Sequence, residues 1–581
     1  MNSLLSNAAA NWRAYLAAGA VRDDLLAGFL VSVLLIPQSL AYAMLAGLPP
    51  DVGLYASLLP AVAYALLGSS PVLAVGPVAV LALMIMQALA VVPAGVTHEE
   101  AALVLAAETG LVLIAASLLR LDALASLMSV PVLHGFETGA TLSIALSQLP
   151  VLLGSPAKGS AAPALWHSAQ ASGWAWTGVS AVYGLAACAL LFAARRLLKG
   201  TLARLAPLAL LIGAMGMAAL THADSHGVML VGALPDLHMP WRLPPASFEL
   251  WRSLFPSALL LGLMTYVSSL VVAESLARKR GERVSARKEL RGLGAANLVA
   301  AFGSGMPVAG SFSRSVLLHD AGSRSRMSGV FAACFMGISM LALTGPLAWL
   351  PKAVLAGTIM VAVLSGLSFT PYRRAWRYAR PEGLLMLAVT LCVVFDSVSV
   401  GLAVGVVGSI GLLLQRTAQP HVARIGRVPG TEHFRNVGRY KVEETPHTLS
   451  LRIDESLVFI NARGLADVVQ GHLEDSRREG RQIDRVLLLM SPINAIDFSG
   501  FDALRGLHDG LAAQGLRLDL SEVKGPVLDR LRQGRWERWF KGQVHMTHHQ
   551  GLQEDRGQLS SGHACTTPDP AADLHLHSGP Q

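Results

Sequence analysis

Charged residues are scarce in this chain. They make up 14% of its 581 residues, whereas hydrophobic residues make up 53%. An ordinary soluble protein carries about a quarter charged residues. The deficit excludes a soluble globular protein as a description of the whole chain, and it predicts a polytopic α-helical membrane protein. Polar residues gather toward the C-terminus, so we expect a soluble domain after the membrane part.

Cysteine is also rare, and its positions argue against two kinds of site. Three of the 4 cysteines, Cys188, Cys334 and Cys392, fall inside apolar segments, and Cys565 lies near the C-terminus. Without a CxxC pair, neither a disulfide framework nor a zinc site is indicated. Histidines near the C-terminus have no ligand frame around them, so we predict no metal and no cofactor. These histidines are His545, His548, His549, His575 and His577.

Two function classes find no support in the remaining residues. The membrane part has neither a metal triad nor a nucleophile beside a base, and His134 alone does not make one, so no enzyme is predicted. The net charge of +8 does not indicate nucleic-acid binding, because the basic residues lie mostly in short loops between apolar spans. In such loops they set the orientation of the protein in the membrane.

The loop charges predict that orientation. If the N-terminus is cytoplasmic, basic residues concentrate in the inner loops at about 195–204, 278–288 and 373–380, and the opposite loops have few. This asymmetry fits the positive-inside rule and an even number of spans, with both termini cytoplasmic and the protein in the inner membrane. No cleavable signal peptide is evident, because the first apolar run is long enough to span.

Fourteen spans are predicted if each broken or short apolar piece is counted, and hydropathy alone supports about twelve. The domain boundaries follow as a cytoplasmic lead (1–24), a transmembrane domain (25–417), a cytoplasmic α/β domain (418–548) and a disordered tail (549–581). The spans lie at about 25–45, 52–67, 71–92, 101–119, 127–149, 175–194, 205–221, 254–277, 289–303, 307–322, 327–349, 352–369, 382–396 and 398–415.

Two interrupted stretches stand out within these spans. The first runs Pro71-Val-Leu-Ala-Val-Gly-Pro-Val-Ala-Val80, and the second runs Pro307-Val-Ala-Gly-Ser-Phe-Ser-Arg-Ser315. We interpret both as half-helices whose N-termini face one anion, with Ser311 or Ser313 as a helix cap. An arginine at membrane depth is costly, which makes Arg314 a candidate site residue. The alternative is a pair of loop breakers between ordinary spans.

Another polar group interrupts the first span. Pro37 predicts a kink that places Gln38 and Tyr42 at mid-depth, where an amide and free backbone groups suit a polar ligand. A kink satisfied by neighbouring helices is an equally good interpretation.

After residue 418 the pattern changes to alternating strands and helices. Such alternation indicates a small α/β domain. The predicted strands are 448–453, 457–461 and 485–490, and the predicted helices are 465–479, 500–514 and 527–532.

Taken together, these segments resemble the sulfate permease (SulP) family of anion transporters with a C-terminal STAS domain. The resemblance covers about residues 20–545. Each motif is weak alone, but their order and spacing are specific. The motifs are Ile36-Pro37-Gln38-Ser39-Leu40-Ala41-Tyr42-Ala43, Gly47-Leu48-Pro49-Pro50, Gly53-Leu54-Tyr55-Ala56-Ser57, 70–77, 310–315, 426–431 and Phe434-Arg435-Asn436.

The resemblance implies a fold of two inverted seven-span repeats. The first four spans and the eighth to eleventh would form a core domain that moves against a gate domain made by the rest. The anion would sit between the broken third and tenth spans. By motif match, the residues that line the site are Gln38, Tyr42, Pro77, Val78, Phe312, Ser313 and Arg314.

Departures from the family pattern bear on ion coupling. A carboxylate found in the eighth span of many bacterial members falls here on Ser268, which cannot change charge near neutral pH. Glu137, an intramembrane carboxylate, is our candidate replacement in coupling to H+ or Na+. The alternative is a carboxylate paired with His134 or lying near the membrane surface. Val52 and Pro71 stand where an aromatic and a basic residue are expected, which weakens a sulfate assignment.

The C-terminal domain carries a regulatory candidate. Ile496-Asp497-Phe498-Ser499-Gly500 resembles the loop in which related bacterial STAS domains are phosphorylated on serine. Ser499 would place a phosphate at a helix N-terminus; alternatively, Asp497 and Ser499 only cap that helix. A regulatory protein and a homodimer are the expected partners, besides the lipid bilayer.

The predicted function is secondary-active transport of an inorganic or small organic anion of the sulfate type. Alternatives are transport or exchange of bicarbonate, chloride or a dicarboxylate, and an uncoupled anion conductance. An alternative of another class is a membrane-anchored STAS signalling scaffold, which would move no anion.

Overall fold

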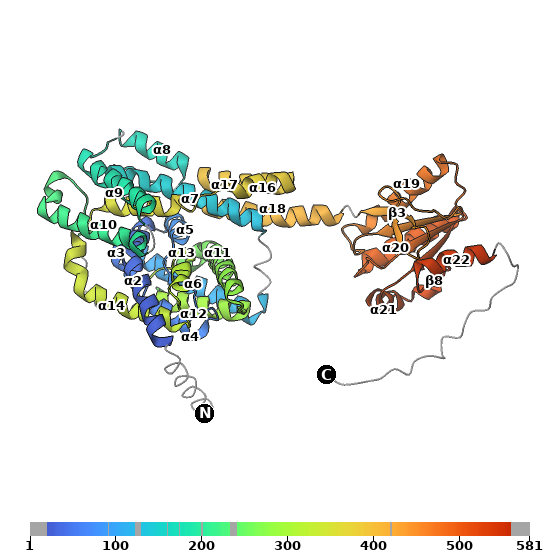
Figure 1. The fold of residues 1–581 in the computed structure, drawn as a ribbon, viewed down its shortest axis with the longest axis horizontal. Helices are drawn as coiled ribbons and strands as arrows, with labels where there is room; N and C mark the ends of the chain where they lie inside the picture. The colour runs from blue at the N-terminus through green and yellow to red at the C-terminus, as the bar shows by residue number, and fades with distance from the viewer. Residues whose placement is uncertain are drawn as a thin grey trace, which may run out of the picture. The chain divides into compact units, whose positions relative to one another are not determined.

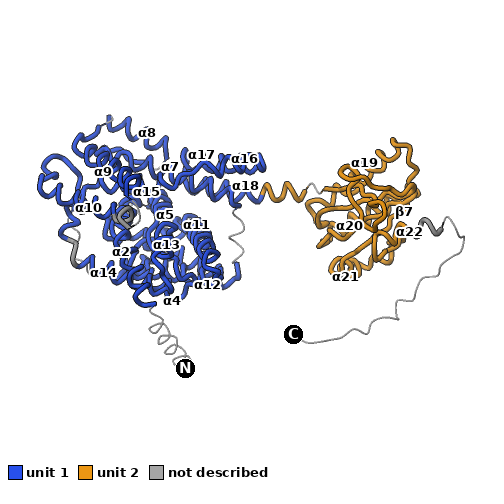
Figure 2. The backbone as a smooth tube through the Cα atoms, in the orientation of Figure 1, with its two compact units in different colours: residues 1–410 blue, residues 411–581 orange. Residues whose placement is uncertain are grey.

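A computed structural model describes residues 20–558, except for 91, 94, 122–128, 160, 174, 199–200, 233–240 and 419–420. The chain divides into two compact units, Met1–Ile410 and Gly411–Gln581, which Figure 2 draws in blue and orange. Each unit has its own hydrophobic core.

Unit 1 is helical apart from two very short strands (Figure 1). Its elements, in chain order, are α2 (Ala20–Leu45), α3 (Pro50–Tyr55), α4 (Leu59–Leu67), β1 (Val75–Gly76), α5 (Ala79–Leu89), α6 (His98–Leu118), α7 (Val130–Leu153), α8 (Ala162–Ala171), α9 (Gly178–Leu197), α10 (Thr201–Leu220), α11 (Phe248–Arg280), α12 (Ala286–Phe302), β2 (Ala309–Gly310), α13 (Phe312–Asp320), α14 (Met327–Ala348), α15 (Lys352–Leu364), α16 (Thr370–Tyr378), α17 (Arg380–Phe395) and α18 (Val398–Ala418). The last turns of α18, from Gly411 on, belong to unit 2.

The described helices of unit 1 can be matched to the fourteen predicted spans. Within the described residues, the segments from α2 to α18 make fourteen spans when α3 and α4 count as one and the short helices α8 and α16 are set aside. Seven candidate spans are both long and apolar enough to cross a bilayer alone. Shorter helices such as α5 and α13 fall below that length because each is half of a broken span.

Small residues let the helices of unit 1 approach closely. A Cβ added at Gly110 of α6 would lie 2.8 Å from the carbonyl oxygen of Gly294 on α12. Close backbone approach of this kind is how helices gain packing energy in a membrane, where lipid removes the hydrophobic drive.

Two buried carboxylates fix helix ends around the broken segments. Asp24 of α2 accepts hydrogen bonds from the backbone N–H groups of Arg324 (2.6 Å) and Ser325 (3.1 Å), in the turn after α13. Glu289 of α12 accepts from the hydroxyls of Tyr64 (2.8 Å) and Ser69 (2.6 Å). Both carboxylates are fully buried, and such bonds offset the cost of burying a charge.

Unit 2 is an α/β domain built on a six-stranded sheet of order β4-β3-β5-β6-β7-β8. The pairs β3–β4 and β3–β5 are antiparallel, and β5 to β8 run parallel. Its elements are β3 (Val422–Arg427), β4 (Phe434–Asn436), β5 (Thr448–Ile453), α19 (Leu465–Arg478), β6 (Arg485–Leu489), α20 (Phe498–Ala513), β7 (Arg517–Ser521), α21 (Gly525–Gln533), β8 (Val544–His545) and α22 (His548–Gln558).

One predicted strand is wrong. Residues 457–461 make a single bridge, between Leu457 and Ile496, and then turn. The side chain of Asn461 accepts from the N–H of Val458 (3.0 Å) and donates to the carbonyl of Ser456 (2.9 Å). Local side-chain bonds of this kind compete with an extended conformation.

The first part of the predicted disordered tail is a helix. α22 runs to Gln558, and tertiary contacts hold its start. The carbonyl of Gly551 accepts from buried Arg485 (2.9 Å), and the Ser521 hydroxyl lies 2.7 Å from Nδ1 of His548. The prediction of disorder is therefore wrong for 549–558, and 559–581 lie outside the described residues.

Candidate anion site

Two buried strands that are far apart in the sequence pair within unit 1. β1 and β2 are antiparallel, with Val75 opposite Gly310 and Gly76 opposite Ala309. The N–H of Ser311 also donates to the carbonyl of Ala74 (2.9 Å). The pairing places the starts of α5 and α13, which follow β1 and β2, next to each other.

Side chains from neighbouring helices hold the strand pair. The hydroxyl of Ser269 on α11 accepts from the N–H of Gly310 (2.8 Å), and that of Ser315 accepts from the N–H of Ala74 (2.9 Å). The amide of Asn297 on α12 accepts from the N–H of Val308 (2.9 Å) and donates to its carbonyl (3.0 Å). All three side chains are buried. Sequence reasoning missed these residues, because a polar residue within a span does not reveal its partner.

Both half-helices begin without a side-chain cap. Val78 precedes α5 and Ser311 precedes α13, and neither side chain makes a cap hydrogen bond. The first intrahelical bonds are donated by Ala82 and Ser315, so the N–H groups before them have no acceptor within their helix. The predicted cap by Ser311 or Ser313 is wrong, since these two hydroxyls lie 3.4 Å from each other instead. Two positive helix ends are thereby left open to an anion.

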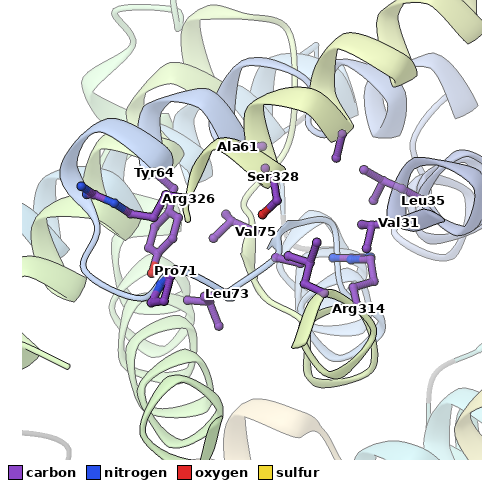
Figure 3. A pocket seen from close by; sticks show the side chains of 14 residues that line it. Val31, Leu35, Ala61, Tyr64, Pro71, Leu73, Val75, Arg314, Arg326 and Ser328 are labelled. Atoms are coloured by element: carbon purple, nitrogen blue, oxygen red, sulfur yellow. The ribbon is translucent and has the colours of Figure 1, made fainter. Parts of the chain in front are cut away.

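Arg314 links the two halves. Its side chain is 1% exposed; Nη2 donates to the carbonyl of Pro77 (2.8 Å) and Nη1 to Oε1 of Gln38 (3.3 Å). Figure 3 shows it beside Val31 and Leu35 at one end of a small pocket, with Tyr64 and Arg326 at the other. The guanidinium therefore bonds to protein groups, and its charge remains close to both helix starts.

A wider cavity of about 410 Å³ lies between two groups of helices. One wall comes from α2 and α13, and the other comes from α9, α10 and α15. Lining residues on the first wall include Pro37, Gln38, Ala41, Tyr42, Ser313 and Val316. Those on the second include Leu191, Arg195, Pro207, Leu211, Thr358 and Ile359. The sequence predicted no residue of the second wall, because the local sequence does not show whether an apolar side chain of a span faces a cavity or a neighbouring helix.

The structure brings together most of the predicted site residues. Gln38, Tyr42 and Ser313 line this cavity. Pro77 is buried and contributes its carbonyl to Arg314. Val78 directly precedes α5, and Phe312 opens α13 with its side chain 60% exposed. α2 stays helical through Pro37, so Gln38 and Tyr42 face the cavity from a continuous helix.

The two coupling candidates lie elsewhere. Ser268 on α11 donates its hydroxyl to the carbonyl of Met264 in its own helix (2.7 Å). The Glu137 carboxylate is 60% exposed on α7 and lies 3.5 Å from Nδ1 of His134. That pairing matches the alternative interpretation of Glu137. Neither residue lines the cavity.

Ser499 lies on the surface of unit 2, in the first turn of α20. Asp497 caps this helix, and its carboxylate accepts from the N–H groups of Gly500 (2.8 Å) and Phe459 (2.7 Å). The Ser499 hydroxyl is thus left outside the cap.

Comparison with known proteins identifies this arrangement. Residues 21–390 match the sulfate permease family, and residues 439–551 match the STAS domain. The chain belongs to the sulfate permease family. This confirms the resemblance drawn from the motifs. Members of this family are membrane anion transporters and not enzymes.

Two curated relatives span nearly the whole chain of this sulfate permease. A protein of Mycobacterium tuberculosis named as a probable sulfate transporter is 33% identical over 515 residues, covering 88% of this chain and 91% of its own. The chloroplastic sulfate transporter 4.1 of Arabidopsis thaliana is 31% identical over 546 residues, covering 90% and 79%.

Solved structures share the fold of this sulfate permease. The murine Solute Carrier 26 family member A9 anion transporter, in the inward-facing state, superposes with a TM-score of 0.81 at 22% identity and covers 92% of each chain. The transmembrane domain of a cyanobacterial bicarbonate transporter, BicA, gives 0.59 at 20% identity and covers 68% of this chain and 98% of its own. The predicted fold, a multi-pass helical transporter followed by a STAS domain, is confirmed.

Proposed function

We propose that this protein carries sulfate or a similar oxyanion across the membrane and binds it where α5 and α13 begin. The observation that carries the proposal is the β1–β2 pairing, which holds two uncapped helix N-termini together, and Ser313 in the first turn of α13 lines a cavity. Each helix end is worth about half a positive charge. The buried guanidinium of Arg314 adds a full charge nearby. Free N–H groups and the Ser313 hydroxyl would orient the oxygens.

Sulfate is the first choice because both curated relatives are named as sulfate transporters. Gln38 and Tyr42 offer an amide and a phenol at the same cavity, which suits an oxyanion with several acceptor atoms. Transport would proceed by movement of the wall made of α2 and α13 against the wall made of α9, α10 and α15. Neither coupling candidate, Ser268 or Glu137, lines the cavity, so we propose no coupling ion.

Uptake of labelled sulfate into proteoliposomes that hold the purified protein tests this function. We expect saturable uptake, and we expect Ser313→Glu to reduce it about tenfold or more, because a carboxylate would meet the anion at close range. Ser313→Gln, of similar size and uncharged, is the matched control and should retain more activity.

Competition by bicarbonate, chloride and dicarboxylates in the same assay ranks the alternative substrates. An anion current without saturable uptake would show that the protein is an uncoupled anion conductance and not a carrier. Complete absence of flux for every anion would favour a membrane-anchored scaffold and overturn the proposal.

We further propose that both termini are cytoplasmic, that the protein lies in the inner membrane, and that it works as a homodimer. The basic loops at 195–204, 278–288 and 373–380 support this orientation. Ser499, exposed beside the cap of α20, is the proposed phosphorylation site through which a regulatory protein would act on unit 2.

A further inference from the structure

The short helix α16 differs from every span around it. It has Arg373, Arg374 and Arg377 within two turns, and none of its residues is buried. No carboxylate partner of these three arginines is found among the described residues. Arg380 follows directly at the start of α17. The helix therefore presents a concentration of positive charge that forms no direct ion pair within the described residues.

Contacts with α17 fix which way the arginines face. Figure 1 shows α16 lying beside α17. The hydroxyls of Tyr372 and Thr390 are hydrogen-bonded, and Trp376 packs on Gly383, where an added Cβ would lie 3.0 Å from Cε3 of the indole. At 100° per residue, Tyr372 and Trp376 share one side of the helix, and Arg374 and Arg377 lie on another. The arginine side is thus turned away from the contacts that Tyr372 and Trp376 make with Thr390 and Gly383.

Beside this arginine side lies a pocket of about 700 Å³ between α7, α16 and α17. Its lining combines apolar side chains, among them Val130, Pro131 and Met386, with the polar ones Arg374, Arg377, His134 and Glu382. Two guanidiniums next to an apolar surface suit a ligand that has both a negative headgroup and a hydrocarbon part.

We propose that this pocket binds an anionic phospholipid, with its phosphate on Arg374 and Arg377 and its acyl chain along the apolar side chains. The position supports this occupant, because α16 connects two membrane segments, α15 and α17, and so lies near the bilayer surface. Phe369 and Tyr378 are 62% and 88% exposed at either end of α16. Exposed aromatic rings and arginines are typical of segments that lie in the headgroup layer.

Other occupants fit the pocket less well. A free inorganic anion would leave the apolar side chains of the pocket exposed to water. An acidic segment of another protein would satisfy the arginines but not the position at the bilayer surface. Only a lipid provides the charge and the hydrocarbon at that depth.

Retention of lipid by the purified full-length protein tests the proposal. Phosphatidylglycerol and phosphatidylcholine are offered together in neutral detergent, and bound lipid is counted by native mass spectrometry. We expect preferential retention of phosphatidylglycerol and a raised thermal unfolding midpoint. The double variant Arg374→Gln/Arg377→Gln should bind phosphatidylglycerol about ten- to thirtyfold more weakly.

Arg373→Gln is the matched control, because it removes the same charge from the same helix outside the pocket. It should keep most of the preference. If the double variant does not fold, Ala375→Glu, which puts a carboxylate at the pocket wall, replaces it. Equal loss in the control and the pocket variant would overturn the proposal. The proposal would also be overturned if inorganic phosphate displaced all bound phosphatidylglycerol, or if the protein retained both lipids equally.

Discussion

Arg314 places a buried positive charge between the two broken segments, where its hydrogen bonds go to protein groups. Its guanidinium donates to the carbonyl of Pro77 on one broken segment and to the side chain of Gln38 on α2. A carbonyl and an amide leave its charge uncompensated, so the positive potential persists at the start of both half-helices. The sequence singled out this residue as a candidate because an arginine in a membrane span is costly without a role. Its actual partners depend on backbone positions far away in the chain.

The two parts of this role can be separated by substitution. Arg314→Gln removes both the positive charge and the planar set of N–H donors of the guanidinium, whereas Arg314→Lys keeps only the charge. We expect both variants to lower the thermal unfolding midpoint, since an orphaned buried acceptor costs about 1–3 kcal/mol. Sulfate uptake should fall more than about tenfold in the glutamine variant and clearly less in the lysine variant. Equal activity in the two variants would show that the charge does not matter.

At the scale of the element, the strand pair decides where the half-helices begin. Each strand has only two residues, and its bonds are completed by Ser269 and Ser315. No sequence pattern identifies so short a strand. The broken spans themselves were predictable, because Gly76 and Pro77 in one and Gly310 in the other interrupt apolar runs. The positions of most helices were predictable for a similar reason, since apolar runs follow the bilayer thickness.

Neighbouring serines on α11 provide a matched test of the strand pair. Ser269→Ala removes the acceptor of the Gly310 N–H, and the buried donor then costs about 1–3 kcal/mol. We expect a lower unfolding midpoint and lower sulfate uptake. Ser268→Ala removes an equal hydroxyl that only bonds its own helix, so it should behave like the unchanged protein. Similar losses in both variants would contradict a special role for Ser269.

At the scale of the whole molecule, two units with separate cores respond to different conditions. Unit 2 contains a buried polar cluster in which His548 is 1% exposed and lies against Ser521. α22, which contains His548, could not be predicted from its polar and glycine-containing sequence. Its stability comes from tertiary bonds to Arg485 and Ser521 instead.

Burial, together with the nearby charge of Arg485, lowers the pKa of His548 to about 3. An unfolded chain takes up this proton near pH 6.5, so it binds more protons than the folded unit between these two values. The stability of unit 2 should therefore fall as the pH drops from about 6.5 toward 3, by up to about 1.4 kcal/mol per pH unit.

Hydrogen exchange of β5 to β7 in the full-length protein measures this slope. His548→Gln should flatten it, and the exposed His433→Gln should leave it unchanged. An unchanged slope in His548→Gln would assign the pH dependence to other groups.

The antiparallel pairing of β1 with β2 has a consequence for selectivity. Backbone hydrogen bonds fix the distance between the N-termini of α5 and α13. That distance cannot increase for a larger solute without breaking the strand pairing. Selection by solute size must then come from the second wall of the cavity, which includes Leu211, Thr358 and Ile359. Relatives that prefer different solutes are expected to differ in the residues of this wall, whereas the paired strands β1 and β2 stay similar in sequence.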